Sequence, residues 1–229
     1  SRGVSYRIAG TWENGEGKKI YLSEIVGNKE FRAVDSAVVA PDFTFLLKGN
    51  VDRVQKMVLV YNSDKRKEII VDGEPMNVMF EETTKEWKGK TSTSVTVTCT
   101  GNREQEFLEK GSSLKTTISF MQLGKMMAAS KVDYDDPVAV DSLKRVFALL
   151  DSSLIAAVNN YMDTTRNSYA STYFFESHLM DNYTFEEVQG FYNNLTDRVK
   201  QSAPGIELKK KIDEMGMVSV GGVAPNFKA

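Results

Sequence analysis

The sequence is short of the residues on which most active sites depend. Its 229 residues contain one cysteine, Cys99, and one histidine, His178. A single thiol cannot form an internal disulfide, a C-x-x-C redox pair or a cysteine zinc cluster. A single histidine excludes most histidine-dependent sites, and the chain has no G-x-S-x-G element to supply a hydrolase serine. We therefore assign no catalytic, cofactor-binding or metal-ligating residue, expect no cofactor, and do not expect this chain to be an enzyme.

The sequence has neither an excess of charge of one sign nor a long apolar run. The 29 basic and 31 acidic residues give a net charge of -2. The chain is therefore not expected to have an electrostatic field that would attract a nucleic-acid backbone or an anionic membrane. We interpret Lys65-Arg66-Lys67 and Lys209-Lys210-Lys211, the densest basic runs, as solvated faces. No apolar stretch reaches ~18 residues, so none is expected to span a bilayer. No signal peptide is visible, which says little about the compartment.

The composition is that of a folded chain. Hydrophobic residues make up 41% and charged residues 26%, close to ordinary globular usage. The length suits one large or two modest domains.

Strand-type patterns fill the first hundred residues. Asn14-Gly15 tolerates positive φ and predicts a tight hairpin between the first two strands. Ala40-Pro41-Asp42 and Asp72-Gly73-Glu74-Pro75 predict further turns. Strands are expected at 4–11, 18–22, 33–39, 43–48, 56–61, 68–71, 77–80 and 94–99. Short strands at roughly 8–12-residue spacing are typical of an antiparallel sandwich or a small barrel.

Helical patterns follow from Gly101. Asn102 is the expected N-cap of a helix toward Met127, which Gly111-Ser112-Ser113 interrupts. Asp136-Pro137 starts the clearest helix. Further helices are expected at 169–180, from the capping-box spacing at 184–187, and at 204–215. Gly216 is expected to end the last helix as a left-handed cap, after which the chain becomes extended.

The fold class expected is therefore α+β, with an N-terminal antiparallel β-sandwich or barrel followed by a helical subdomain. The boundaries are 1–100 for the β-rich domain, 101–215 for the helical subdomain and 216–229 for an extended segment.

Three groups of residues invite a functional interpretation and have a simpler structural one. His178 on a helix is more readily a packed histidine than a catalytic base. The cluster of Asp133, Asp135 and Asp136 could bind calcium, but it lacks the glycine and glutamate of an EF-hand and fits a helix cap better. The glycine-rich run at 15–18 is no phosphate loop, because it lies between two strands, and we interpret it as a hairpin turn.

Sulfur and aromatic side chains remain open to two interpretations. Met121, Met126 and Met127 either fill gaps in a core or form a partner-binding surface. Cys99 is expected to pack as a small hydrophobe. Residues that could line a ligand groove, or belong to the core, are Tyr61, Phe80, Trp87 and the helical tyrosines.

The end of the sequence resembles the start of a known domain. Residues 218–227 read V-S-V-G-G-V-A-P-N-F. This resembles the V-x-V-G-x-x-A-P-x-F opening of thioredoxin-like domains in the alkyl-hydroperoxide-reductase and thiol-specific-antioxidant superfamily. In that family a C-x-x-C motif follows within a few tens of residues. The sequence stops at Ala229, so those cysteines are not included and the thioredoxin-like domain is absent.

The N-terminal region resembles a second family. The motifs, in order, are Y-R-I-A-G at 6–10, K-I-Y-L at 19–22, V-D-S-A-V-V at 34–39, F-T-F-L-L-K-G at 43–49 and T-G-N-R-E-Q-E at 100–106. They are similar to the domain of unknown function that precedes thioredoxin-like domains in exported Bacteroidetes proteins. Asp42 departs from the glycine common before the phenylalanine. Together the two resemblances cover most of residues 4–107 and 216–227.

These resemblances imply a function for the chain. It is expected to be the non-catalytic accessory module of an exported thiol-disulfide oxidoreductase, positioning the redox domain or docking a substrate or partner. The implied partners are the missing C-terminal thioredoxin-like domain and protein substrates or a second copy. The implied location is the periplasm or cell surface, with a lipid anchor upstream as the one membrane contact. The alternative is a periplasmic or surface protein that binds glycan or peptide on its β-domain.

Overall fold

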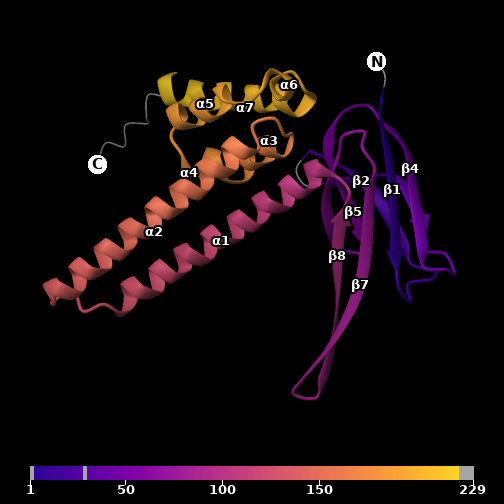
Figure 1. The fold of residues 1–229 in the computed structure, drawn as a ribbon, viewed down its shortest axis with the longest axis horizontal. Helices are drawn as coiled ribbons and strands as arrows, with labels where there is room; N and C mark the ends of the chain where they lie inside the picture. The colour runs from indigo at the N-terminus through magenta and orange to yellow at the C-terminus, as the bar shows by residue number, and fades with distance from the viewer. Residues whose placement is uncertain (1–2, 28–29, 222–229) are drawn as a thin grey trace. The chain divides into compact units, whose positions relative to one another are not determined.

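The computed structural model describes residues 3–27 and 30–221, which divide into two compact units. Within these ranges, unit 1 comprises residues up to Glu106 together with 202–204, and unit 2 comprises 107–201 and residues from Gly205 onward. Strands fill unit 1 and helices fill unit 2 (Figure 1), so the predicted α+β class is confirmed. The division falls inside a helix at Glu106, whereas the sequence pattern placed it at residue 100.

Unit 1 is a sandwich of two open sheets. In the described residues its strands are β1 (Val4–Trp12), β2 (Lys19–Val26), β3 (Glu30–Val38), β4 (Thr44–Val51), β5 (Gln55–Tyr61), β6 (Lys65–Val71), β7 (Met76–Trp87) and β8 (Lys90–Thr100). The strand orders are β4-β1-β7-β8 and β3-β2-β5-β6. The sheets do not close, so the sandwich is correct and the barrel is not. Neighbouring strands are antiparallel except β1 and β7, which run parallel.

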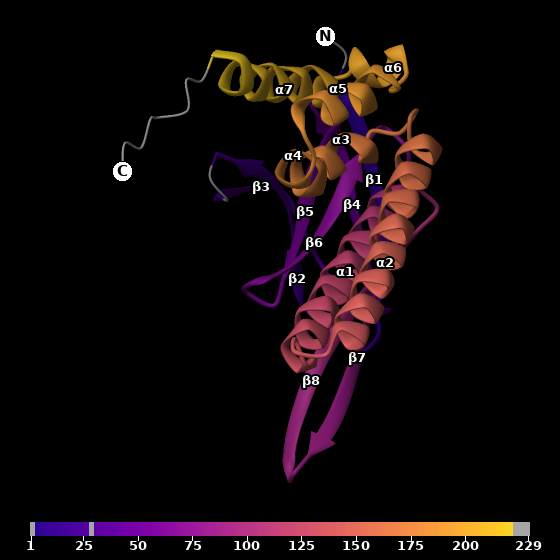
Figure 2. The same cartoon turned by 90° about the vertical axis from the view of Figure 1, so that its left-hand side faces the viewer.

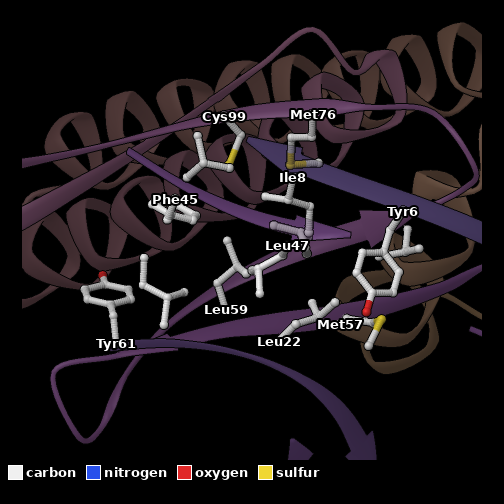
Figure 3. Close-up of a cluster of buried hydrophobic side chains, with 14 of the residues drawn as sticks. Tyr6, Ile8, Leu22, Phe45, Leu47, Met57, Leu59, Tyr61, Met76 and Cys99 are labelled. Atoms are coloured by element: carbon white, nitrogen blue, oxygen red, sulfur yellow. The ribbon is translucent and has the colours of Figure 1, made fainter. Parts of the chain in front are cut away.

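Aromatic packing fills the space between the sheets. Alternation along β1 turns Tyr6, Ile8 and Trp12 inward, because successive side chains of a strand point to opposite faces. The Trp12 ring stacks on Phe80 at 4.7 Å between centroids, and Tyr61 meets Phe80 edge-on at 5.1 Å. Figure 3 shows part of this core, with side chains from both sheets meeting in the middle.

The predicted hairpin at Asn14-Gly15 is wrong, although Asn14 does adopt a positive φ of 59°. β1 and β2 belong to different sheets, so the turn carries the chain across the sandwich instead of pairing its neighbours. Gly15 lies against the Trp12 ring, where a Cβ atom would approach Cγ to 2.5 Å. The glycine is therefore explained by the buried tryptophan and not by hairpin geometry.

β7 and β8 extend far beyond the predicted strands. Their ladder continues from Asn77 opposite Thr100 to Trp87 opposite Lys90. Side chains on both strands are exposed over most of this extension, so neither face shows the apolar alternation that identifies a strand in a sequence. Backbone hydrogen bonds hold the ribbon, and Trp87 lies exposed at its tip.

Gln105 joins the start of the first helix to an edge strand. β6 is the edge of its sheet. The Ile70 N–H donates to Gln105 Oε1 at 3.0 Å, and Gln105 Nε2 donates to the Glu68 carbonyl at 3.0 Å. The side-chain amide thus pairs with backbone groups that an edge strand leaves open, which gives the glutamine of the T-G-N-R-E-Q-E motif a structural role.

A partly buried hydrogen bond connects the two sheets. Tyr6 on β1 donates its hydroxyl to Asp35 Oδ2 on β3 at 2.8 Å. Burial, followed by this hydrogen bond and the charge of Asp35, raises the pKa of Tyr6 to about 12. Gly49 lies opposite, where a Cβ atom would come within 2.5 Å of the tyrosine oxygen.

Tyr6→Phe is expected to lower the free energy of unfolding by about 1–2 kcal/mol, because Asp35 loses its donor. Urea denaturation measures this loss. The control Tyr21→Phe changes a partly exposed ring on β2 and should stay within about 0.5 kcal/mol of the parent. Equal effects of the two substitutions would show that the cross-sheet bond contributes nothing.

The helices, within the described residues, are α1 (Arg103–Lys131), α2 (Pro137–Thr164), α3 (Ala170–Phe174), α4 (Met180–Asn182), α5 (Phe185–Asn193), α6 (Asp197–Lys200) and α7 (Ala203–Gly221), with the π-helical turn η1 (Phe175–Leu179) between α3 and α4. The predicted caps are confirmed: Asn102 accepts from the Gln105 N–H at 2.9 Å, and Asp136 accepts from Val138. Thr184 and Glu187 form the predicted capping box. No helix among the described residues is long and apolar enough to cross a membrane.

Two glycines that were expected to break helices lie inside them. α1 runs through Gly111 without interruption, and α7 continues past Gly216 to Gly221, so the extended segment expected from Gly216 is wrong to that point. A Cβ atom at Gly111 would approach the Tyr161 hydroxyl to 2.5 Å, and one at Gly216 would approach the Phe185 ring to 2.7 Å. Because neither glycine has a side chain, an aromatic ring can pack against the helix at each position. Residues 222–229, with the A-P-N-F sequence, lie outside the described residues.

Gly111→Ala is expected to destabilise the chain by about 1–2 kcal/mol, although alanine favours a helix by ~1 kcal/mol. The new methyl group displaces Tyr161, whose hydroxyl donates to the Phe107 carbonyl at 2.9 Å. The matched change Gly124→Ala, in the same helix with open space around its Cβ, should stabilise by about 0.5–1 kcal/mol. Thermal unfolding compares them, and a gain in both would contradict the packing role of Gly111.

Candidate functional site

The helical unit contains a large groove. It has a volume of about 1300 Å³ and is lined by α1, α2, the turn η1, α4, α5 and the residues next to them. Figures 1 and 2 show α1 and α2 side by side as an antiparallel hairpin, with α3 to α7 gathered beside the end away from the α1–α2 connection. The groove therefore lies entirely within unit 2.

The base of the groove is apolar. Ile118 of α1 and Leu154 and Val158 of α2 belong to the buried core of the unit and line the groove as well. Farther along the hairpin, Met126 and Ile155 line it while remaining 70% and 51% exposed. Apolar side chains that are this exposed within a concave surface are typical of a binding site for an apolar partner.

His178 lies in the wall of the groove, on the π-helical turn. Its ring lies 5.3 Å from Phe174 and 6.1 Å from Tyr183 between centroids. Asn182 donates to the His178 carbonyl at 2.8 Å and lies 3.4 Å from Nδ1. Burial lowers the pKa of His178, the charge of Lys115 lowers it further, and Asp181 opposes them. The histidine is therefore a largely neutral part of an aromatic wall.

The rim is polar and carries both signs of charge. Lys115, Asp163 and Glu187 lie around the groove together with amides such as Gln122 and Asn194. Among the residues that the structure describes, no three acidic, cysteine or histidine side chains gather to hold a metal ion. The polar partner of His178 is an amide. The arrangement offers shape and an apolar surface for binding, without a paired nucleophile and base.

The structural interpretations of the aspartate cluster and of Cys99 hold, whereas that of residues 15–18 does not. Asp133 accepts from the Asp135 N–H at 3.0 Å and Asp136 caps α2, so these carboxylates organise the α1–α2 connection. Cys99 is buried in the core of unit 1. Residues 15–18 form the crossing turn described above and not a hairpin turn.

The methionines divide between the two interpretations. Met121 packs against the core of unit 2. Met126 and Met127 are largely exposed, and Met126 lines the groove. Methionine surfaces adapt to many partners because the side chain is flexible and polarisable. For these two residues the partner-surface interpretation is favoured.

The aromatic side chains of unit 1 lie mostly in its core. Tyr6, Tyr61, Phe80 and Trp12 are buried between the sheets. Trp87 and Tyr21 remain accessible, on different strands and in different sheets. The aromatic groove residues come instead from unit 2, where Tyr183 and Phe191 line the wall. Tyr183 lies between α4 and α5, and Phe191 lies on α5. The helical tyrosines were predicted from the sequence as possible groove residues, whereas Phe191 was not.

His178→Gln is expected to reduce the loss of stability on acidification. The ordinary pKa is 6.5 and burial lowers it in the folded chain. Between the two values the unfolded chain takes up a proton that the folded chain does not, so stability is full above pH ~6.5 and falls as pH decreases through this window. Thermal unfolding between pH 8 and 5 should show a smaller decrease for the variant. Parallel curves for the two proteins would contradict a buried neutral histidine.

Comparison with known families places one match on the chain. Residues 6–108 match the family model described as Domain of unknown function (DUF4369). The match spans the strands of unit 1 and the start of α1, and it confirms the resemblance of the N-terminal region to a domain of unknown function. A comparison with curated proteins found no match. The pairing of this domain with a thioredoxin-like domain stays a prediction.

Proposed function

We propose that the chain is the non-catalytic docking module of an exported thiol-disulfide oxidoreductase, and that the groove of unit 2 holds an apolar segment of its protein substrates. The redox chemistry belongs to a thioredoxin-like domain that follows the A-P-N-F sequence. The proposed setting is the periplasm or the cell surface, with any membrane contact made by a lipid anchor upstream.

The observation that carries the docking role is the groove itself. At about 1300 Å³ it exceeds the roughly 300–1,000 Å³ of ordinary small-molecule sites. Its exposed residues are flexible or aliphatic, as Met126, Leu123 and Ile155 illustrate. Such a surface suits polypeptide segments of varied sequence better than one defined ligand.

The redox assignment is supported by sequence. The ordered N-terminal motifs and the 218–227 sequence resemble parts of the same kind of exported protein, and residues 6–108 match the domain of unknown function. Reading the gene beyond the codon for Ala229 tests it. A frame that continues into C-x-x-C supports the proposal, and a frame that stops there removes the redox role while leaving the groove.

The glycan-binding alternative has less support than docking at the groove. It relied on aromatic residues of the β-domain, of which Trp12, Tyr6 and Tyr61 are buried, while Trp87 and Tyr21 are exposed but lie in different sheets. Peptide binding remains part of the proposal, at the groove of unit 2.

Ile155→Lys is expected to weaken docking, because it places a charge on the apolar lining of the groove. In the longer protein, kcat/KM for reduction of insulin should fall about 5- to 30-fold, equivalent to about 1–2 kcal/mol. Reduction of a small disulfide such as oxidised glutathione should not change, since it needs no groove.

The matched control is Ile206→Lys. Ile206 is an isoleucine of α7 that is 50% exposed and does not line the groove. The Ile206→Lys substitution should leave kcat/KM for both reactions unchanged. If the Ile155→Lys protein reduced insulin with the same kcat/KM as the parent protein, the groove would not be the docking site.

A further inference from the structure

Three helices each present one face to the groove of unit 2. The lining residues of α1 begin at Lys115 and recur at i+3, i+4, i+7, i+8 and i+11, as far as Met126. On α2 the same spacing runs from Asp151 to Asp163, and α5 contributes Glu187 with its i+3 and i+4 neighbours. Residues at this spacing share one face of a helix. The groove is therefore a space between the faces of three helices, with η1 and α4 beside it.

The dimensions of this space fit a helix. From Lys115 to Met126 the lined face of α1 is about 17 Å long, at ~1.5 Å per residue. A helix of that length and about 10 Å in diameter encloses roughly 1,300 Å³, and the volume of the groove is about 1300 Å³. An extended segment of equal length encloses roughly 800 Å³, at ~4.8 Å between strands and ~10 Å between sheets. A helix therefore fills the groove, whereas a single strand does not.

The walls of the groove also favour a helix, because they offer no strand edge. Among the described residues, those that line it belong to helices or to the turns that follow them. An extended segment exposes its backbone N–H and C=O groups and gains affinity by pairing them with the edge of a sheet. A helix satisfies those groups internally and requires only an apolar surface. Ile118, Leu154 and Val158 provide that surface at the base of the groove.

The charges of the groove favour a basic segment. Asp151, Asp163 and Glu187 line it, against one lysine, Lys115. Asp151 is paired with Lys125 at 2.6 Å. The carboxylates of Asp163 and Glu187 therefore outnumber the ammonium group of Lys115. A segment with lysine or arginine beside its apolar face complements them.

We propose that the segment docked in the groove is an amphipathic α-helix of about three turns, with its apolar face on Leu154 and Val158 and with basic residues on its flanks. This inference rests on the proposed docking function and specifies the conformation and charge of the docked segment. Apolar anchors at i, i+3, i+4 and i+7 are the usual means by which a helix binds in a groove. Many protein segments have this pattern, because helices of globular proteins normally carry one apolar face.

Isothermal titration calorimetry of the 229-residue chain with two peptides tests the conformation. Both peptides contain about 15 residues of leucine, glutamine and lysine in the same proportions. The helical peptide has leucine at i, i+3, i+4 and i+7, and the alternating peptide has leucine at every second position. The helical peptide is expected to bind at least about 10-fold more tightly. Replacing its lysines by glutamate should weaken binding about 3- to 10-fold.

A Leu123→Lys variant tests the location of the binding site. Leu123 of α1 lines the groove and is 50% exposed, so a lysine there should weaken binding of the helical peptide about 10-fold. The matched control Leu149→Lys adds the same charge on α2, at a leucine that is 73% exposed and does not line the groove. The control should leave the affinity unchanged. Circular dichroism verifies that both variants keep their helices.

Three results would overturn the inference. They are equal or tighter binding of the alternating peptide, an affinity for the helical peptide that Leu123→Lys does not reduce, and binding of neither peptide. The docking role itself is judged separately, by the reduction of insulin in the Ile155→Lys protein. A failure of the helix is thus distinguishable from a failure of docking.

Discussion

The stack of Trp12 on Phe80 is the interaction on which the division of roles in this protein depends. It joins the parallel neighbours β1 and β7 within one sheet, Tyr61 of the facing sheet packs edge-on against both rings, and Phe45 packs edge-on against Phe80. Burying these rings stabilises a small sandwich strongly. It also removes them from the surface, so unit 1 keeps few aromatic side chains with which to bind a ligand. The recognition role that we propose is therefore assigned to the helices.

The helical unit has the opposite character. Its core is confined to one end of the α1–α2 hairpin, and apolar side chains continue beyond that core into the groove and along the rest of α1 and α2. The groove, walled by His178 and Tyr183, follows from this excess. The docking role that we propose for unit 2 rests on this groove, and Lys125 and Asp151, which flank the contact of α1 with α2, pair with each other.

Much of the fold could be predicted from the sequence, because local rules determine it. Asp136-Pro137, Thr184 and Asn102 begin helices where capping chemistry requires. Three of the errors share one cause: a glycine was interpreted from turn or helix propensity, whereas the aromatic ring packed against it explains it. Gly15 packs against the ring of Trp12, Gly111 against that of Tyr161 and Gly216 against that of Phe185. The β7–β8 ribbon was missed because it buries no face. The groove was missed because its residues come from three separate segments of the chain, each ordinary by itself.

Hydrogen-exchange mass spectrometry of the chain, with and without the reduced and alkylated B chain of insulin, tests the docking role most directly. This measurement needs no redox domain. The account predicts slower exchange in the segments that line the groove, at 115–126, 151–163 and 177–194, with the strands of unit 1 unchanged. Unchanged exchange along all three segments, or protection confined to the strands, would contradict it.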